Sequence, residues 1–295
     1  MTMPKFDYVR SGSLEQAVRL MNDTEYTNKL IAGGTDLLVY LHYEQPSFTR
    51  VVDISFLDEL KIMEQYGDEI LLGAGVCFTD IIESSLLQEK VPFLVEACRS
   101  IGSPQIRNLG TLGGNVVNAA ACADSLPVLV SLEAVAHLVG PAGERDIPVT
   151  DLVEGPNQAR LESGEILVYF VFKIPPEGVK TSFIKLGRRN AQAISRLSMA
   201  AMGRLDSSGQ IDFVRIVPGA ATPKTIRFTG IETALLGKKY SPEFVHQIAE
   251  LAAEEMISIT GWRWSTEYKA KVIAVLVERV LTQVFVPEAL IPEVT

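Results

Sequence analysis

Two glycine-rich segments constrain this chain more than any other feature of its sequence. The first is Ile31-Ala32-Gly33-Gly34-Thr35-Asp36-Leu37, and the second is Thr111-Leu112-Gly113-Gly114-Asn115. Glycine allows consecutive backbone N–H groups to approach an anion closely, and a helix that begins at such a segment adds partial positive charge. We therefore expect the two segments to converge in space and to hold one dinucleotide pyrophosphate between them.

Each glycine pair is weak evidence when it is taken alone, because such pairs also occur in ordinary turns. Neither segment has the G-x-G-x-x-G spacing of a standard NAD domain or the G-x-x-x-x-G-K-[ST] spacing of a nucleotide triphosphatase. The sequence also has no G-x-S-x-G element and no evident pairing of a nucleophile with a base. We predict no catalytic residue in this chain, and we expect a bound cofactor to perform the chemistry.

Charge and apolar content exclude several classes of partner. The chain has 295 residues, and 27 Lys and Arg against 36 Asp and Glu give a formal charge of −9. This balance argues against sequence-independent binding of nucleic acid or of an anionic membrane. The first residues lack the pattern of a secretory signal, and no apolar run reaches the roughly 18 residues of a membrane span. We expect a cytoplasmic protein that binds neither membrane nor nucleic acid.

The cysteines and histidines are too scattered for a metal site. All six are isolated in the sequence: Cys77, Cys98, Cys122, His42, His137 and His246. Without a C-x-x-C pair or a histidine cluster, this chain alone can assemble neither an iron–sulfur cluster nor a structural zinc site. Any metal centre is therefore expected on a partner.

Apolar periodicity predicts an α+β chain with a small N-terminal part and a larger mixed part. In residues 1–55 we expect a helix at 13–21 capped by Ser13, strands at 30–32 and 51–54, a helix beginning at Leu37, and a small parallel sheet. In residues 56–176 we expect strands at 70–74, 134–139 and 166–172 and helices at 78–84 and 92–100. Together these two subdomains form the first predicted domain, residues 1–176.

The clearest boundary is at Pro175-Pro176. For a smaller C-terminal domain, 177–286, we expect strands at 182–186, 198–205 and 213–217, the last two joined as a hairpin. Helices are expected at 242–256 and 267–284, the second with a continuous apolar face that packs into the core. Residues 287–295 read as a loose tail.

Four stretches carry a resemblance to a known family: Ala32–Leu37, Gln105–Asn115, Ala123–Ser125 and Lys185–Arg189. They resemble the FAD-binding medium subunit of the xanthine dehydrogenase and carbon monoxide dehydrogenase family of molybdenum hydroxylases. The match runs in order from about Phe6 to Val284. The resemblance implies a vanillyl-alcohol-oxidase-type FAD-binding fold of two α/β subdomains. A smaller α/β C-terminal domain with an antiparallel sheet and helices follows it.

The resemblance also implies which residues contact FAD. They are Leu30, Ile31, Ala32, Gly33, Gly34, Thr35, Asp36, Leu37, Ile101, Thr111, Leu112, Gly113, Gly114, Asn115, Asp124, Leu167 and Lys185. In the family, the first segment wraps the pyrophosphate and the second closes over it, while Leu167 and Lys185 match positions that line the flavin end. Ile101 falls where relatives often place an aromatic ring, so this chain departs from the family there.

Reasoning from the residues alone leaves several of these positions open. Asp124 suits a helix cap as well as a cofactor contact. Lys185 suits a strand that buries its stem and exposes its ammonium, or an ammonium that faces the flavin N1/O2 edge and raises its potential. The basic pair Arg188 and Arg189 suits a solvated loop or a patch for the phosphates of a nicotinamide acceptor. Asn115 offers an amide to tie the two glycine segments together.

The function implied by the resemblance is that of an FAD-dependent oxidoreductase subunit. It passes electrons from the 2Fe-2S clusters of an iron–sulfur subunit to NAD or another acceptor, and a third subunit carries the molybdenum cofactor. An alternative is a docking subunit of the same complex that binds FAD weakly or not at all. A third reading, a self-sufficient flavin oxidase, lacks an evident acid or base for its substrate.

Overall fold

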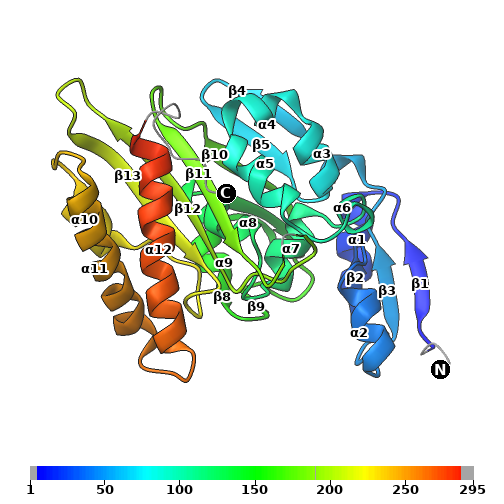
Figure 1. Ribbon diagram of the computed structural model, residues 1–295. Helices are drawn as coiled ribbons and strands as arrows, with labels where there is room; N and C mark the ends of the chain where they lie inside the picture. Colours follow the sequence, from blue (N-terminus) through cyan, green and yellow to red (C-terminus); the bar gives the residue numbers. More distant parts are fainter. Residues whose placement is uncertain (1–4, 190, 287–295) are drawn as a thin grey trace.

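Three sheets of three or more strands, each with its own helices, follow one another along the computed structural model (Figure 1), which describes residues 5–189 and 191–286. The small N-terminal sheet and the C-terminal helices lie at opposite ends of the molecule. The predicted tail, 287–295, lies outside the described residues. Within the described ranges, none of the helices combines the length and apolar character that crossing a bilayer requires.

The N-terminal part is a parallel sheet with two helices. Its elements are β1 (Asp7–Arg10), α1 (Leu14–Met21), β2 (Asn28–Ile31), α2 (Leu37–Tyr43) and β3 (Arg50–Asp53). The strand order is β1-β3-β2, and both pairings are parallel. Ser13 caps α1 by accepting the N–H of Gln16. The predicted helix and parallel sheet are confirmed, whereas β1 was not foreseen because it is short and largely exposed.

The middle part is an antiparallel sheet covered by short helices. Its elements are the 3₁₀ turn η1 (Asp58–Leu60), β4 (Met63–Tyr66), β5 (Glu69–Gly73), α3 (Phe78–Glu83), α4 (Ser85–Lys90), α5 (Pro92–Arg99), α6 (Pro104–Arg107), α7 (Leu112–Asn118), α8 (Ser125–Ser131), β6 (Val135–Gly140), β7 (Gly143–Pro148), α9 (Val149–Leu152), β8 (Val153–Gly155), β9 (Gln158–Ala159) and β10 (Ile166–Lys173). The strand order is β4-β5-β10-β6-β7. The three predicted strands and two predicted helices are present.

The second glycine segment differs from the expected loop. Gly113 and Gly114 lie in the first turn of α7, and Thr111 is its N-cap. The helix is too short and too rich in glycine to show apolar periodicity, so sequence reasoning did not detect it.

The C-terminal part is an antiparallel sheet with helices on one face. Its elements are β11 (Lys180–Leu186), β12 (Leu197–Leu205), β13 (Ile211–Gly219), α10 (Thr229–Leu235), α11 (Pro242–Thr260) and α12 (Thr266–Phe285). The β12–β13 hairpin is present as predicted. The face of α12 that carries Ile273, Val277 and Val280 is fully buried in the C-terminal core, as the apolar pattern predicts.

Strand β12 has both faces buried. Ala200 and Met202 belong to the core of the middle part, whereas Met199 and Ala201 belong to the core beneath α11 and α12. This alternation follows from the two-residue period of a strand. The sheet β11-β12-β13 therefore packs apolar residues against both neighbours and holds the C-terminal helices and the middle part together.

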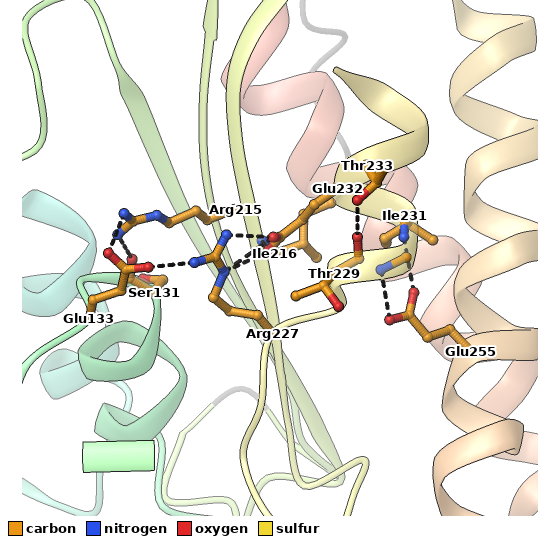
Figure 2. A network of polar contacts seen from close by, with 11 residues as sticks. Ser131, Glu133, Arg215, Ile216, Arg227, Thr229, Ile231, Glu232, Thr233 and Glu255 are labelled. Atoms are coloured by element: carbon orange, nitrogen blue, oxygen red, sulfur yellow. Dashed lines mark hydrogen bonds and ion pairs between the residues drawn. The ribbon is translucent and has the colours of Figure 1, made fainter. Parts of the chain in front are cut away.

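A charged network crosses the same junction (Figure 2). Glu133, directly after α8, pairs with Arg215 on β13 and with Arg227 in the loop before α10. Arg227 also pairs with Glu232 of α10 at 2.6 Å, and Glu232 accepts the backbone N–H of Ile216. The side chain of Glu133 is 53% exposed, whereas that of Glu232 is 5% exposed.

We expect Glu232→Ala to destabilise the protein more than Glu133→Ala. Removing Glu232 leaves the buried N–H of Ile216 without its acceptor and the half-buried Arg227 with Glu133 as its remaining ion-pair partner, a loss on the order of 3 kcal/mol. Removing Glu133 breaks exposed ion pairs, which contribute roughly 1 kcal/mol or less each. Urea unfolding measures the free energy of unfolding of both variants. An equal loss in the two variants, or a larger loss in Glu133→Ala, would contradict this ranking.

Candidate functional site

The two glycine segments lie side by side. A Cβ built on Gly33 would stand 1.7 Å from the carbonyl oxygen of Leu109 and 3.1 Å from the Cα of Gly110, the residue before Thr111. No side chain fits in this space, so the backbones can approach only because residue 33 is glycine. The predicted convergence of the two segments is present in the structure.

The first segment carries a run of unpaired backbone donors. It connects the end of β2 at Ile31 with the start of α2 at Leu37. Within the described residues, the N–H groups of residues 32–37 have no hydrogen-bond acceptor, and the first bonded N–H is that of Leu38, which donates to the Gly34 carbonyl at 2.9 Å. Gly34 has a positive φ of 71°, which glycine adopts without strain. Such a run of donors at a helix start suits an oxyanion.

The second segment does not offer donors, contrary to expectation. The N–H groups of residues 112–115 are already bonded, to Val76 O at 3.0 Å, Ala74 O at 2.8 Å, Thr111 Oγ1 at 3.1 Å and Thr111 O at 3.0 Å. The expectation is wrong because Thr111 caps α7 and accepts the N–H groups of residues 114 and 115, while two carbonyls in the turn after β5 accept those of residues 112 and 113. This segment instead offers a surface without side chains: Gly114 is exposed, and a Cβ there would meet only Thr111 Oγ1.

Asn115 does not join the two segments in the structure. Its Oδ1 accepts the hydroxyl of Ser125 at 2.7 Å and so links α7 to α8. A cross-link between the glycine segments is not among the hydrogen bonds of the described residues. The close approach at Gly33 is the contact described above between the first segment and the residues before the second.

A buried ion pair lies beside the glycine segments. Asp124 Oδ2 is 2.7 Å from Lys185 Nζ, and the two side chains are 5% and 13% exposed. Asp124 Oδ1 accepts the hydroxyl of Ser195. Although Asp124 stands at the N-cap position of α8, its carboxylate does not cap that helix. The ammonium of Lys185 is not in solvent. The structure therefore shows neither a helix-capping carboxylate at Asp124 nor a solvent-exposed ammonium at Lys185.

Two helix ends stabilise the charges of this pair. Lys185 Nζ also donates to the carbonyl of Ser100 at 2.8 Å, at the C-terminal end of α5. Asp124 stands at the N-terminal end of α8. Each charge thus lies at the helix end of opposite polarity. Burial nevertheless raises the pKa of the Asp124 carboxyl, and the positive charge of Lys185 opposes this shift.

Arg107 organises the turn next to this pair, a role that sequence reasoning missed. Its Nη1 donates to the carbonyls of Ile101 at 3.0 Å and of Arg99 and Gly102 at 3.3 Å. Together with Lys185, it satisfies the free carbonyls at the end of α5. Arg107 lies inside the Gln105–Asn115 motif, and this position could have marked it as a candidate site residue.

Three further predicted residues, Asp36, Ile101 and Leu167, have different surroundings. Asp36 shares a neighbourhood with Asp124 through Cys122, which was not a predicted site residue: burial raises the pKa of the Cys122 thiol, and the charges of Asp124 and Asp36 add to the shift. Ile101 is half-buried beside the middle core. Leu167 is only 6% exposed and lies within that core on β10, so its contact with a cofactor stays a prediction.

Two surface cavities lie away from these residues. One is beside β1 and is lined by Lys5, Phe6 and Asp7, among others. The other lies where β10 meets β12 and β13, with Phe172 and Met202 in its wall. Neither is lined by a predicted site residue. Within the described ranges no cluster of histidine, cysteine and acidic side chains is arranged to hold a metal ion.

Comparison with known proteins identifies the family. Residues 4–175 match the family described as the FAD binding domain in molybdopterin dehydrogenase. The chain belongs to this family. Residues 182–284 match the CO dehydrogenase flavoprotein C-terminal domain. The resemblance inferred from the sequence motifs is therefore confirmed, and so is FAD as the cofactor. The N–H groups of residues 32–37, the side-chain-free surface at Gly114 and the Asp124–Lys185 pair fit a dinucleotide.

Similar proteins match over almost their whole lengths. The chain is 34% identical over 278 residues to the xanthine dehydrogenase FAD-binding subunit of Escherichia coli O157:H7, covering 94% of each chain. It is 29% identical over 283 residues to the carbon monoxide dehydrogenase medium chain of Hydrogenophaga pseudoflava, covering 95% of this chain and 97% of that one.

A solved structure of carbon monoxide dehydrogenase from Hydrogenophaga pseudoflava superimposes with a TM-score of 0.88 at 28% identity, and the match covers 96% of this chain and 98% of that one. Quinoline 2-oxidoreductase from Pseudomonas putida 86 gives a TM-score of 0.89 at 25% identity, with the same coverage. The mixed α+β fold, with an FAD-binding domain and a C-terminal domain, is thus confirmed.

Proposed function

We propose that this chain is the FAD-carrying electron-transfer subunit of a heteromeric molybdenum hydroxylase. An iron–sulfur subunit with 2Fe-2S clusters supplies the electrons, a further subunit carries the molybdenum cofactor, and NAD or another acceptor receives the electrons. The proposal rests on the run of unpaired N–H groups at residues 32–37, where Gly33 lies against the backbone of Leu109 and Gly110, just before the second glycine segment.

The cofactor would contact three groups of residues. Leu30–Leu37 would hold the pyrophosphate through backbone donors, and Thr111–Asn115 would cover it closely. Asp124 and Lys185 would contact the flavin half, with Ile101 and Leu167 as apolar neighbours. Lys185 Nζ has three N–H donors and uses two of them in the protein, for Asp124 and Ser100, which leaves one for a ligand. Bound FAD supplies a group that accepts single electrons and releases them in pairs.

The relatives and the cysteines support the proposed partners and location. Names such as "FAD-binding subunit" and "medium chain" belong to proteins that are parts of larger assemblies. Cys77, Cys98 and Cys122 are free thiols, which suits a reducing compartment such as the cytoplasm. The two proposed acceptor-binding arginines are exposed, but Arg189 donates to the carbonyls of Ala191 and Gln192. An acceptor phosphate would therefore pair first with Arg188.

The test uses the full-length chain loaded with FAD. Yellow protein with close to one acid-releasable FAD per chain is expected, and anaerobic NADH should bleach the flavin band if NAD is the acceptor. Bleaching by an artificial reductant but not by NADH would point to another acceptor. Colourless protein that resists FAD loading would refute the proposal and would favour the docking subunit.

A further inference from the structure

Ser195 is a buried serine for which the sequence suggested no function. It lies in the connection between β11 and β12 and is 6% exposed. This connection closes immediately after it, because the N–H of Arg196 donates to the carbonyl of Leu186 at 2.9 Å. The hydroxyl of Ser195 points away from solvent and donates to Asp124 Oδ1.

Ser195 and Lys185 hold the same carboxylate from one hairpin. Lys185, on β11, donates to Oδ2 of Asp124 at 2.7 Å, while Ser195, just before β12, donates to Oδ1. Lys185 is paired with Ser198 in the β11–β12 ladder, so both donors have fixed places on this hairpin. Asp124 comes from the other side of the junction, at the start of α8.

We propose that Ser195 is a positioning residue that fixes the plane of the Asp124 carboxylate and, through it, the Lys185 ammonium toward bound FAD. This inference rests on the proposed FAD-binding function. A carboxylate held by one oxygen still rotates about its Cβ–Cγ bond. Donors on both oxygens stop this rotation, and each oxygen keeps a lone pair for a ligand hydroxyl.

Removal of the Ser195 hydroxyl affects the ammonium as well as the carboxylate. Asp124 Oδ1 would lose its donor in a place where water does not readily replace it, and an unsatisfied buried acceptor is costly. The other titratable groups in the neighbourhood of Asp124 in the described residues are the thiols of Cys98 and Cys122, whose pKa values are raised by burial, and the carboxyl group of Asp36. None of the three is a cation, so Lys185 alone would have to hold the carboxylate.

Ser182 provides a matched control. It lies on β11, is 3% exposed, and its hydroxyl donates to the side-chain oxygen of Gln283 on α12. It is thus a buried serine of the same sheet with a side-chain acceptor, but its acceptor is the neutral amide of an exposed residue, Gln283. Loss of its hydroxyl removes a buried hydrogen bond without touching the Asp124–Lys185 pair.

The experiment compares Ser195→Ala, Ser195→Thr, Ser182→Ala and Asp124→Asn in the full-length chain. The probe is FAD, with its dissociation constant, its midpoint potential and the melting temperature of the FAD-free protein as readouts. We expect Ser195→Ala to weaken FAD binding by about tenfold, which is the loss of one hydrogen bond to a charged group. The midpoint potential of the bound FAD should shift as well. Ser195→Thr should restore both values, and Ser182→Ala should change only the melting temperature.

Several outcomes would overturn this role for Ser195. Wild-type affinity and potential in Ser195→Ala, together with weakened binding in Asp124→Asn, would refute it and leave the FAD site intact. Equal effects of Ser195→Ala and Ser182→Ala on all three readouts would show a merely structural role. No FAD binding by the wild-type chain would refute both proposals. If Ser195→Ala does not fold, Ser195→Cys, which keeps a weak donor, should give a smaller loss than tenfold; unchanged binding would again refute the role.

Discussion

Replacing Gly33 by alanine is expected to separate the two glycine segments and to abolish stable FAD binding. The added Cβ would stand 1.7 Å from the Leu109 carbonyl oxygen, and backbone atoms cannot move aside as the end of a flexible side chain can. Overpacking of this kind costs roughly 1–3 kcal/mol, and here the displaced backbone also carries the donors of residues 32–37. Urea unfolding of the FAD-free protein and FAD titration measure the two effects.

Gly155→Ala is the matched control for this substitution. The atom nearest to a Cβ at Gly155 is 3.6 Å away, an ordinary contact, so neither stability nor FAD affinity should change appreciably. Wild-type FAD affinity in Gly33→Ala would mean that contact between the two segments is not needed for the cofactor.

Gly114→Val should separate cofactor binding from folding. Gly114 is exposed, and a Cβ there would meet only Thr111 Oγ1, at 2.8 Å, within the cap of α7. We expect a folded protein that does not retain FAD, because the branched side chain would occupy the place of the pyrophosphate. Circular dichroism and acid-released flavin test this expectation. Stoichiometric FAD in the folded variant would remove the second segment from the site.

Replacing Lys185 by alanine is expected to have the largest effect on stability and on the flavin together. The substitution leaves the buried Asp124 carboxylate without its cation, and breaking a buried pair in this way costs about 3–5 kcal/mol. The flavin midpoint potential should fall, because a positive charge near the reduced flavin is lost. Potentiometric titration of the FAD-loaded variant measures the potential, and an unchanged value would contradict the proposed role of Lys185.

The stability loss in Lys185→Ala should shrink as the pH falls. Burial already raises the pKa of Asp124, and without Lys185, which lowers it, the folded-state pKa rises further. A carboxyl with a raised folded-state pKa stabilises the protein while it is protonated, at low pH, and that contribution is lost as the pH rises through this pKa. The deficit should therefore be largest at neutral pH. A deficit that grows on acidification would contradict this reasoning.

Lys173→Ala is the control for this charge deletion. Lys173 is 3.7 Å from Asp68, and both side chains are more than 70% exposed. Exposed pairs of this kind contribute little to stability. We expect almost no change in the free energy of unfolding or in the flavin potential.

Local sequence rules predicted much of the fold. Ser13 followed by Gln16 marked the start of α1, and the apolar spacing of residues 272–284 marked the buried face of α12. The short elements α4, α6, α7 and β7 were not foreseen, because a helix of one or two turns or an exposed strand shows no reliable period. Gly114 illustrates this limit, since nothing in its immediate sequence distinguishes a loop from the first turn of a helix.

By itself, the sequence determined the family, the cofactor and the two glycine segments. These depend on residue types in a fixed order, and Gly33-Gly34 and the Gln105–Asn115 motif are readable without coordinates. Only the tertiary structure decided which N–H groups are free. Those of the second segment are bonded to Ala74, Val76 and Thr111, whereas those of the first are not.

The hydrogen bonds from Lys185 and Ser195 to Asp124 were likewise decided by tertiary structure. These residues are 61 and 71 positions from Asp124 in the chain, and they meet it because the β11–β12 hairpin packs against the start of α8. Hydrogen bonds and ion pairs depend on distance and direction in space, and no local pattern of residue types specifies either for groups so far apart in the chain.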